Sequence, residues 1–150
     1  MTDTSATPRF GLPLLALAQA QKEVTHNEAL TLLDALLHAA VEAGPLSAPP
    51  GAPAEGQSWI VGAAPTGAWE GHETAIALWT SGGWRFLAAR EGTRIVRLAD
   101  GAWLRFHGGA WAGPETIVPP SGGTVIDLEA RAALAALILS LDAQGLMISG

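Results

Sequence analysis

Two acidic residues in one short loop have the spacing of a catalytic pair. Glu70 and Glu73 lie in a stretch flanked by glycines, and two carboxylates held together can serve as acid and base in sugar hydrolysis. The same spacing fits two solvated loop acids, which is the interpretation we favour. The sequence has no G-x-S-x-G elbow and no glycine-rich phosphate loop, so it predicts a protein that is not an enzyme.

The histidines do not form a metal-binding pattern. They are His26, His38, His72 and His107. None belongs to an H-x-x-x-H or H-E-x-x-H arrangement, and no cluster of acids has metal-ligand spacing. Cysteine is absent, which removes thiolate ligands and disulfides. We therefore expect no metal and no cofactor.

Tryptophan carries most of the information in the sequence. The six tryptophans fall within 53 residues, and three Gly–Trp turns recur as "WTSGGWRF" (79–86), "ADGAWLRF" (99–106) and "HGGAW" (107–111). In one interpretation, which we favour, Trp59, Trp79 and Trp103 anchor a core and the turn tryptophans close its ends. In the other, indoles stay partly exposed and stack on sugars or on a partner protein; these are Trp69, Trp84 and Trp111.

Arginines alternate with apolar residues in the same region. Arg85, Arg94, Arg97 and Arg105 should lie on the sheet face opposite the apolar residues. A solvated sheet face is the simplest interpretation. Alternatively, such arginines could hydrogen-bond sugars or pair with a glutamate of a neighbouring subunit. Our candidate contacts for a glycan or partner are Arg85 and Arg105 together with Trp69, Trp84 and Trp111.

An arm and a helix are expected to precede this region. Residues 1–18 contain prolines and leucines that predict an extended arm packed on the rest of the protein. Helical spacing indicates a helix over 25–43, with a Thr25–Glu28 capping box or an earlier start at Gln19. Gly44 and Pro45 should end it. Its apolar stripe is wide enough for docking or oligomerisation and comprises Leu30, Leu33, Leu37 and Val41.

From residue 57 the apolar period changes to two, which predicts strands. Residues 45–56 form a linker rich in proline and glycine. Five short strands are then predicted, and their glycine turns favour a small antiparallel sheet or barrel. They lie in the stretches 57–63, 74–80, 84–89, 93–99 and 102–108.

A second helix is predicted over 128–144, after a linker at 113–123. Asp127 should cap it and Gly145 should end it. Apolar residues cover most of its circumference, so we expect burial in an oligomer through Leu134, Leu137 and Leu141. The fold class is α+β, divided into an arm and helix (1–44), a Trp-rich β module (45–114), and a linker with the C-terminal helix (115–150).

The charge and hydropathy exclude several classes of partner. The net charge is −6 and no stretch is basic, so nucleic acid and anionic lipid are not expected partners. The first ten residues lack a signal-peptide pattern. The longest apolar run, 132–141, is too short to cross a bilayer. We expect synthesis in the cytoplasm and no membrane partner.

Several stretches together resemble a domain of unknown function found in structural proteins of alphaproteobacterial phages and gene transfer agents. These stretches are residues 8–37, 49–92, 100–111 and 129–147. The β region has the family's elements G-x-x-W-I-V-G (Gly56–Gly62), G-x-W-x-G-H (Gly67–His72) and G-G-W-x-F (Gly82–Phe86). Their order is more specific than any one of them.

The resemblance implies a virion component, either a head-spike base or an adaptor associated with a tail fibre, that supports attachment to the host cell surface. It implies a homo-oligomer that contacts capsid or tail proteins and a fibre protein of the same particle, with capsular polysaccharide as a further candidate partner. It implies no catalytic residues. A carbohydrate-binding module and a tail-fibre protein remain as alternatives.

Overall fold

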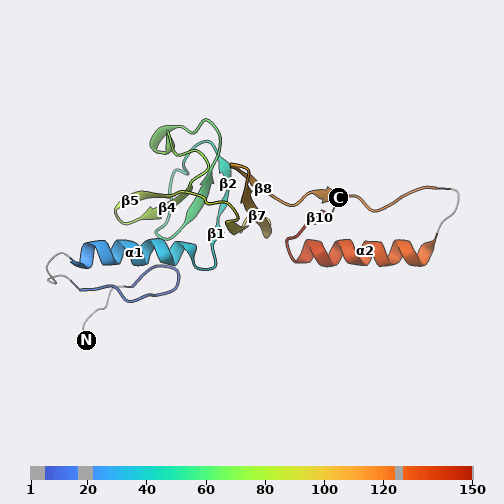
Figure 1. The fold of residues 1–150 in the computed structure, drawn as a ribbon, viewed down its shortest axis with the longest axis horizontal. Helices are drawn as coiled ribbons and strands as arrows, with labels where there is room; N and C mark the ends of the chain where they lie inside the picture. The colour runs from blue at the N-terminus through green and yellow to red at the C-terminus, as the bar shows by residue number, and fades with distance from the viewer. Residues whose placement is uncertain (1–5, 17–21, 124–126, 150) are drawn as a thin grey trace.

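The protein has an α+β fold, as the sequence predicts. The computed structural model describes residues 6–16, 22–123 and 127–149, and Figure 1 shows two sheets between two helices. Along the chain the elements are α1 (Lys22–Leu36), β1 (Ala40–Val41), β2 (Ala43–Leu46), β3 (Ser58–Val61), the 3₁₀ turn η1 (Gly67–Trp69), β4 (Ile76–Thr80), β5 (Gly83–Leu87), β6 (Arg94–Arg97), β7 (Ala102–His107), β8 (Ala110–Ala112), β9 (Thr116–Ile117), α2 (Leu128–Ala143) and β10 (Ile148–Ser149).

Two four-stranded sheets share the same plan. Their strand orders are β2-β3-β4-β5 and β1-β6-β7-β8. In each sheet three strands run antiparallel as a meander, and a short strand from residues 40–46 adds in parallel at one edge. The five predicted strands are confirmed as β3 to β7. The sheets are mixed because a chain segment before the predicted β region supplies both edge strands.

The main core lies between the two sheets. It consists of aliphatic side chains from five strands: Val41, Ile60, Ile76, Ile95 and Leu104. Full burial of one such side chain stabilises the fold by roughly 1.5–3 kcal/mol. Because both sheets contribute, neither can bury its inner face without the other.

The N-terminal arm is held against α1 by one buried carboxylate. Asp34 accepts hydrogen bonds from the Thr7 hydroxyl at 2.8 Å and from the backbone N–H groups of Arg9 and Phe10 at 2.9 Å each. Further along the arm, the Asn27 side-chain amide makes two hydrogen bonds to the backbone of Leu15. The expectation that the arm packs on the protein is confirmed for residues 6–16.

The guanidinium of Arg9 caps the end of α1. It donates to the carbonyl oxygens of Asp34 and Ala35 at 2.9 and 2.8 Å and to that of His38 at 3.1 Å. The last carbonyls of a helix lack partners within the helix and attract positive charge. This cap is one reason that the helix ends where it does.

The prediction of a helix over 25–43 is wrong at its C-terminal end, and at its N-terminal end the structure agrees with the alternative in which Thr25 lies inside the helix. The helix begins at Lys22, which places Thr25 inside it, and it ends at Leu36; Gln19 lies outside the described residues. Val41 is fully buried in β1 instead of lining a helix. Burial in the core outweighs the few tenths of a kcal/mol by which helix propensities differ. Val41 is therefore unavailable for docking, whereas Leu33 and Leu37 are exposed.

Gly44 lies in β2 and does not end a helix. Its φ is +133°, and a Cβ atom there would come within 2.9 Å of three atoms of Ile60. Only glycine fits so close to the neighbouring strand. The boundary that we expected between residues 44 and 45 therefore falls within β2, and residues 40–46 belong to the β module.

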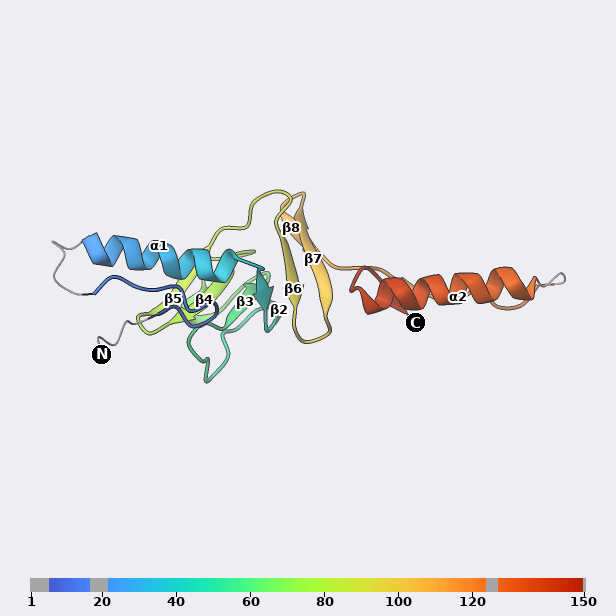
Figure 2. The same ribbon diagram turned by 90° about the horizontal axis from the view of Figure 1, so that it is seen from below.

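The second helix is confirmed as α2. Asp127 caps it by accepting a hydrogen bond from the N–H of Ala130 at 2.9 Å. β9, which lies within the predicted linker, and β10, which follows the helix, pair in parallel beside it. Figures 1 and 2 both show α2 projecting away from the β module. Neither helix of the described residues has the length and apolar character required for a bilayer span.

Replacing Asp34 should loosen the arm. We expect Asp34→Ala to lower the free energy of unfolding by about 3 kcal/mol, because it leaves donors of the arm without their charged acceptor. Urea denaturation measures the change. Glu73→Ala removes an exposed acid and is the control; equal losses in the two variants would show that Asp34 does not hold the arm.

Candidate functional site

The outer face of the β2-β3-β4-β5 sheet is covered by tryptophans. Trp84 contacts three other indoles edge to face, with ring centroids 4.9 Å from Trp79, 5.3 Å from Trp69 and 5.7 Å from Trp59. Trp69 reaches the cluster from η1, in the loop between β3 and β4. Such contacts stabilise by roughly 0.5–1.5 kcal/mol beyond the area buried. The indoles thus form a second core.

This cluster corrects our interpretation of Trp69. The alternative interpretation required a partly exposed indole at this position, but the Trp69 side chain is fully buried. Trp84 is half-buried in the same cluster. Trp111 belongs to the other sheet, where its Nε1 donates to the Thr74 carbonyl at 2.8 Å. The three candidate tryptophans therefore do not form one binding face.

Trp103 corrects the opposite expectation. We placed Trp103 in the core, but this residue is 44% exposed. β7 alternates strictly: Ala102, Leu104 and Phe106 point into the core, and Trp103, Arg105 and His107 point outward. The exposed indole thus lies on the same face as the candidate residue Arg105.

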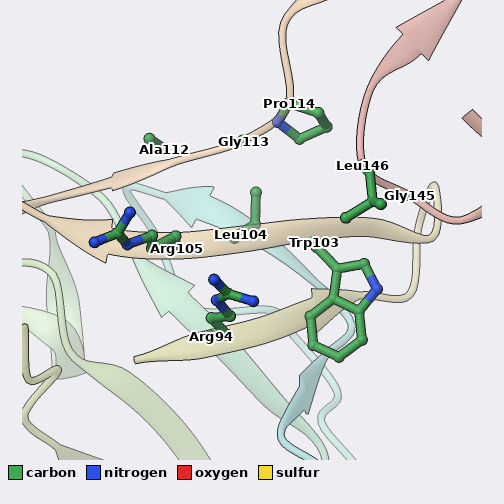
Figure 3. A pocket seen from close by; sticks show the side chains of 9 residues that line it. All are labelled: Arg94, Trp103, Leu104, Arg105, Ala112, Gly113, Pro114, Gly145 and Leu146. Carbon is green, nitrogen blue, oxygen red and sulfur yellow. The ribbon is translucent and has the colours of Figure 1, made fainter. Parts of the chain in front are cut away.

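A hollow of about 420 Å³ lies over this outward face. This volume is within the range of about 300–1,000 Å³ that is usual for small-molecule sites. Figure 3 shows the strands β6 and β7 as its floor and the segment after α2 at one side. Its lining residues are Arg94, Trp103, Leu104, Arg105, Ala112, Gly113, Pro114, Gly145 and Leu146.

Two arginines face each other across the floor of the hollow. Arg94 and Arg105 are directly opposite in the antiparallel register of β6 and β7. Like charges at such a position destabilise a sheet. Among the described residues neither guanidinium takes part in a hydrogen bond or ion pair that would offset the repulsion; Arg105 contributes only a small Coulombic effect on Glu91. The arrangement can accept an anion.

Several other charged groups of the protein are paired within the chain. The Glu91 carboxylate binds the His107 ring and the Gly108 N–H, and these contacts lower the pKa of Glu91. Arg97 lies beside Asp100 with a shortest contact of 2.5 Å and lowers the pKa of its carboxyl. Arg85, a candidate for contact with a partner, pairs at 3.2 Å with Glu28 of the same chain. Arg94 and Arg105 therefore differ from Arg85 and Arg97, whose guanidiniums are paired with acids of the same chain.

The loop that carries Glu70 and Glu73 does not line the Trp103 hollow. Glu70 and Glu73 are both exposed, and His72 stacks on Phe86 with ring centroids 3.6 Å apart. A smaller hollow of about 230 Å³ lies beside His72 and Phe86. Within the ranges that the structure describes, no group of three or more His, Cys, Asp or Glu residues could hold a metal ion.

Gly145 closes one side of the Trp103 hollow. Its carbonyl accepts a hydrogen bond from the Trp103 backbone N–H at 3.0 Å, and a Cβ atom on it would lie 2.2 Å from the Gly101 oxygen. Its φ is +67°. This contact fixes the segment after α2 against the β6–β7 turn and brings Leu146 to the hollow.

Sequence reasoning missed Trp103 and Arg94 as members of one site. The period of two in "AWLRFH" already indicates that Trp103 shares a face with Arg105. What it cannot indicate is the pairing of Arg94 with Arg105 or the approach of Gly145, since both depend on contacts between distant parts of the chain.

A known protein family matches the central part of the chain. Residues 26–112 match the family described as a protein of unknown function, DUF2793, which is more than half of the chain. The chain belongs to this family. The match begins within α1 and ends at the last residue of β8. No curated protein is significantly similar to the chain.

Substitution of Gly145 should detach the C-terminal segment from the β module. In Gly145→Ala the new Cβ would collide with the Gly101 carbonyl, so we expect faster hydrogen exchange at the Trp103 amide. Gly108→Ala is the matched control, because Gly108 also has a positive φ of 60° but has open space around it. Unchanged exchange at Trp103 would contradict this role.

Proposed function

We propose that this protein is a structural component of a phage-like or gene-transfer-agent particle. In this proposal it is the base of a head spike or an adaptor for a fibre, and it supports attachment of the particle to the host cell surface. The family resemblance described above supports the assignment to such a particle. The adaptor role is supported by the arrangement of its surfaces, since the arm with α1 and the module around α2 lie at opposite ends of the β module (Figure 2).

The exposed apolar surface of α2 is the observation that carries the proposal. Leu128 is 75% exposed, Leu139 is 63% exposed and Leu137 is 54% exposed. Ile138 is the only buried residue among the described side chains of this helix. A helix that is apolar around its circumference is stable in water only when other protein covers it.

The strands beside α2 cannot supply that cover. β9 and β10 are two residues each and form a sheet of two strands. Two paired strands alone are at best marginally stable in water and depend on packing against a helix, and strands of two residues have little surface with which to cover the outer leucines of α2. We infer that this C-terminal module packs against the same module in other copies of the chain, which would bury the leucines of all copies at once.

An apolar groove in the module offers a place for such packing. It has a volume of about 390 Å³ and lies between α2 and the segment around β9. The predicted oligomer residues Leu134, Leu137 and Leu141 line it, together with Ile117, Val118, Pro120, Ile138 and Met147. Side chains of a neighbouring copy could fill it.

The arm and α1 provide a separate surface for docking to the particle. Leu33, Leu36 and Leu37 are exposed near the end of α1. In this proposal they contact capsid or tail proteins, while the C-terminal module joins the copies and presents a fibre protein. No step of the proposal requires catalysis or a cofactor.

A second candidate function is carbohydrate binding. It is favoured by the hollow at Trp103, where an exposed indole lies beside two arginines that form no ion pair with any other described residue. The two functions are compatible, because the hollow and the outer leucines of α2 are different surfaces.

The oligomer can be tested with two lysine substitutions on α2. Leu139→Lys places a charge in the apolar surface and should convert the oligomer to a monomer in light scattering at micromolar concentration. Ser140→Lys places the same charge on the next residue, which is exposed and polar, and should leave the oligomer intact. A stable monomeric parent protein would contradict the self-association.

The particle assignment has its own experiment. Particles released by the bacterium that carries this gene should contain the protein when they are purified and examined by mass spectrometry. Cryo-electron microscopy should then place it at a head spike or at the base of a fibre. Purified particles that lack the protein would overturn the proposal.

A further inference from the structure

The outward face of β6 and β7 combines two features that together suit an anionic ligand with an apolar face. One is the cross-strand pair Arg94 and Arg105, and the other is the exposed indole of Trp103. Figure 3 shows the three side chains in a row, with the Arg94 guanidinium between the Arg105 guanidinium and the indole in this view. All three line the same hollow.

No acid of the described residues balances the arginine pair, whose two side chains are exposed to solvent. Glu91, the acid that acts on Arg105, is already bound to His107 and Gly108. The chain as a whole carries a net charge of −6, so a local pair of unbalanced cations is not a consequence of a basic composition. A carboxylate between the two guanidiniums would remove the repulsion and make charge-assisted hydrogen bonds.

The indole indicates what the anion is attached to. The face of an aromatic ring is electron-rich, and it packs well against the C–H groups on one side of a sugar ring. Leu146 and Pro114 add apolar walls at the same hollow. A sugar that carries a carboxylate therefore matches both parts of the site.

We propose that this hollow binds an acidic sugar unit of a polysaccharide. The carboxylate is held by Arg94 and Arg105, and the apolar face of the ring lies on Trp103. Nucleic acid fits less well, because its phosphates follow an extended backbone and no stretch of the chain is basic enough to track them. This inference deepens the second candidate function above and is independent of the assembly through α2.

The first experiment compares an acidic glycan with its neutral counterpart. The full-length protein is titrated with tetragalacturonate and with the same tetrasaccharide in which every carboxylate is methyl-esterified, and tryptophan fluorescence or calorimetry is recorded. We expect the acid to bind at least about tenfold more tightly than the ester, since the ester cannot form charge-assisted hydrogen bonds. The affinity for the acid should fall as salt is added.

The second experiment uses variants of the three residues. Arg94→Gln, Arg105→Gln and Trp103→Ala should each weaken binding of tetragalacturonate by about tenfold or more, and Trp103→Phe should retain part of the affinity. Arg90→Gln removes the same charge from an exposed arginine outside the hollow and should bind as the parent does. Thermal unfolding of each variant shows whether the fold is kept.

Several results would overturn the proposal. These are equal binding of the acid and its ester, an equal loss of binding in Arg90→Gln, or tighter binding of an oligonucleotide or a glutamate-rich peptide at the same residues. Failure of both tetragalacturonate and a sialylated trisaccharide to bind at millimolar concentration would also overturn it. Light scattering on the same samples reports the oligomer separately, so loss of glycan binding and loss of assembly are distinguishable.

Discussion

The close approach of Gly44 to the main chain of Ile60 is the constraint on which the β module depends. The short segment of residues 40–46 pairs with β6 through β1 and with β3 through β2, so it ties one sheet to the other. The Ser58 hydroxyl donates to the Ala40 carbonyl and Arg97 donates to the Gly44 carbonyl. A side chain at position 44 would push β2 away from β3 and would expose part of the core between the sheets.

The two sheets use similar Gly–Trp turns for different purposes. In the β2-β3-β4-β5 sheet, Trp69 arrives from the β3–β4 loop and completes an indole cluster around Trp84, so both faces of that sheet are buried. No described residue covers the outer face of β7 in the same way, and Trp103 stays exposed there. The difference lies in the covering loop and not in the turn. One sheet gains stability from its indoles, and the other leaves the indole of Trp103 exposed.

The surfaces proposed for assembly and for glycan binding rest on different physical forces. The leucines of α2 favour self-association through removal of apolar area from water, which is strong but not directional. Arg94, Arg105 and Trp103 favour an acidic sugar through charge and ring geometry, which are directional. Gly145 connects the two, because the segment that follows α2 packs on the β6–β7 turn and lines the hollow. An assembly through α2 would therefore present several copies of the hollow together.

The sequence by itself determined the local features: the period-two strands β3 to β7, the Asp127 cap, the end of α2 near Gly145 and the α+β class, because each depends on neighbouring residues. Tertiary structure alone decided the end of α1, where burial of Val41 and the Arg9 cap outweigh helical periodicity. It also decided which indoles are buried, since Trp69 covers Trp84 from a distant loop, whereas Trp103 faces outward beside Arg105. The meeting of Arg94 with Arg105 follows from strand register, and the wall at Gly145 follows from a contact with Gly101. Composition and spacing cannot specify such long-range contacts, because they form only when the sheets and the C-terminal segment pack together.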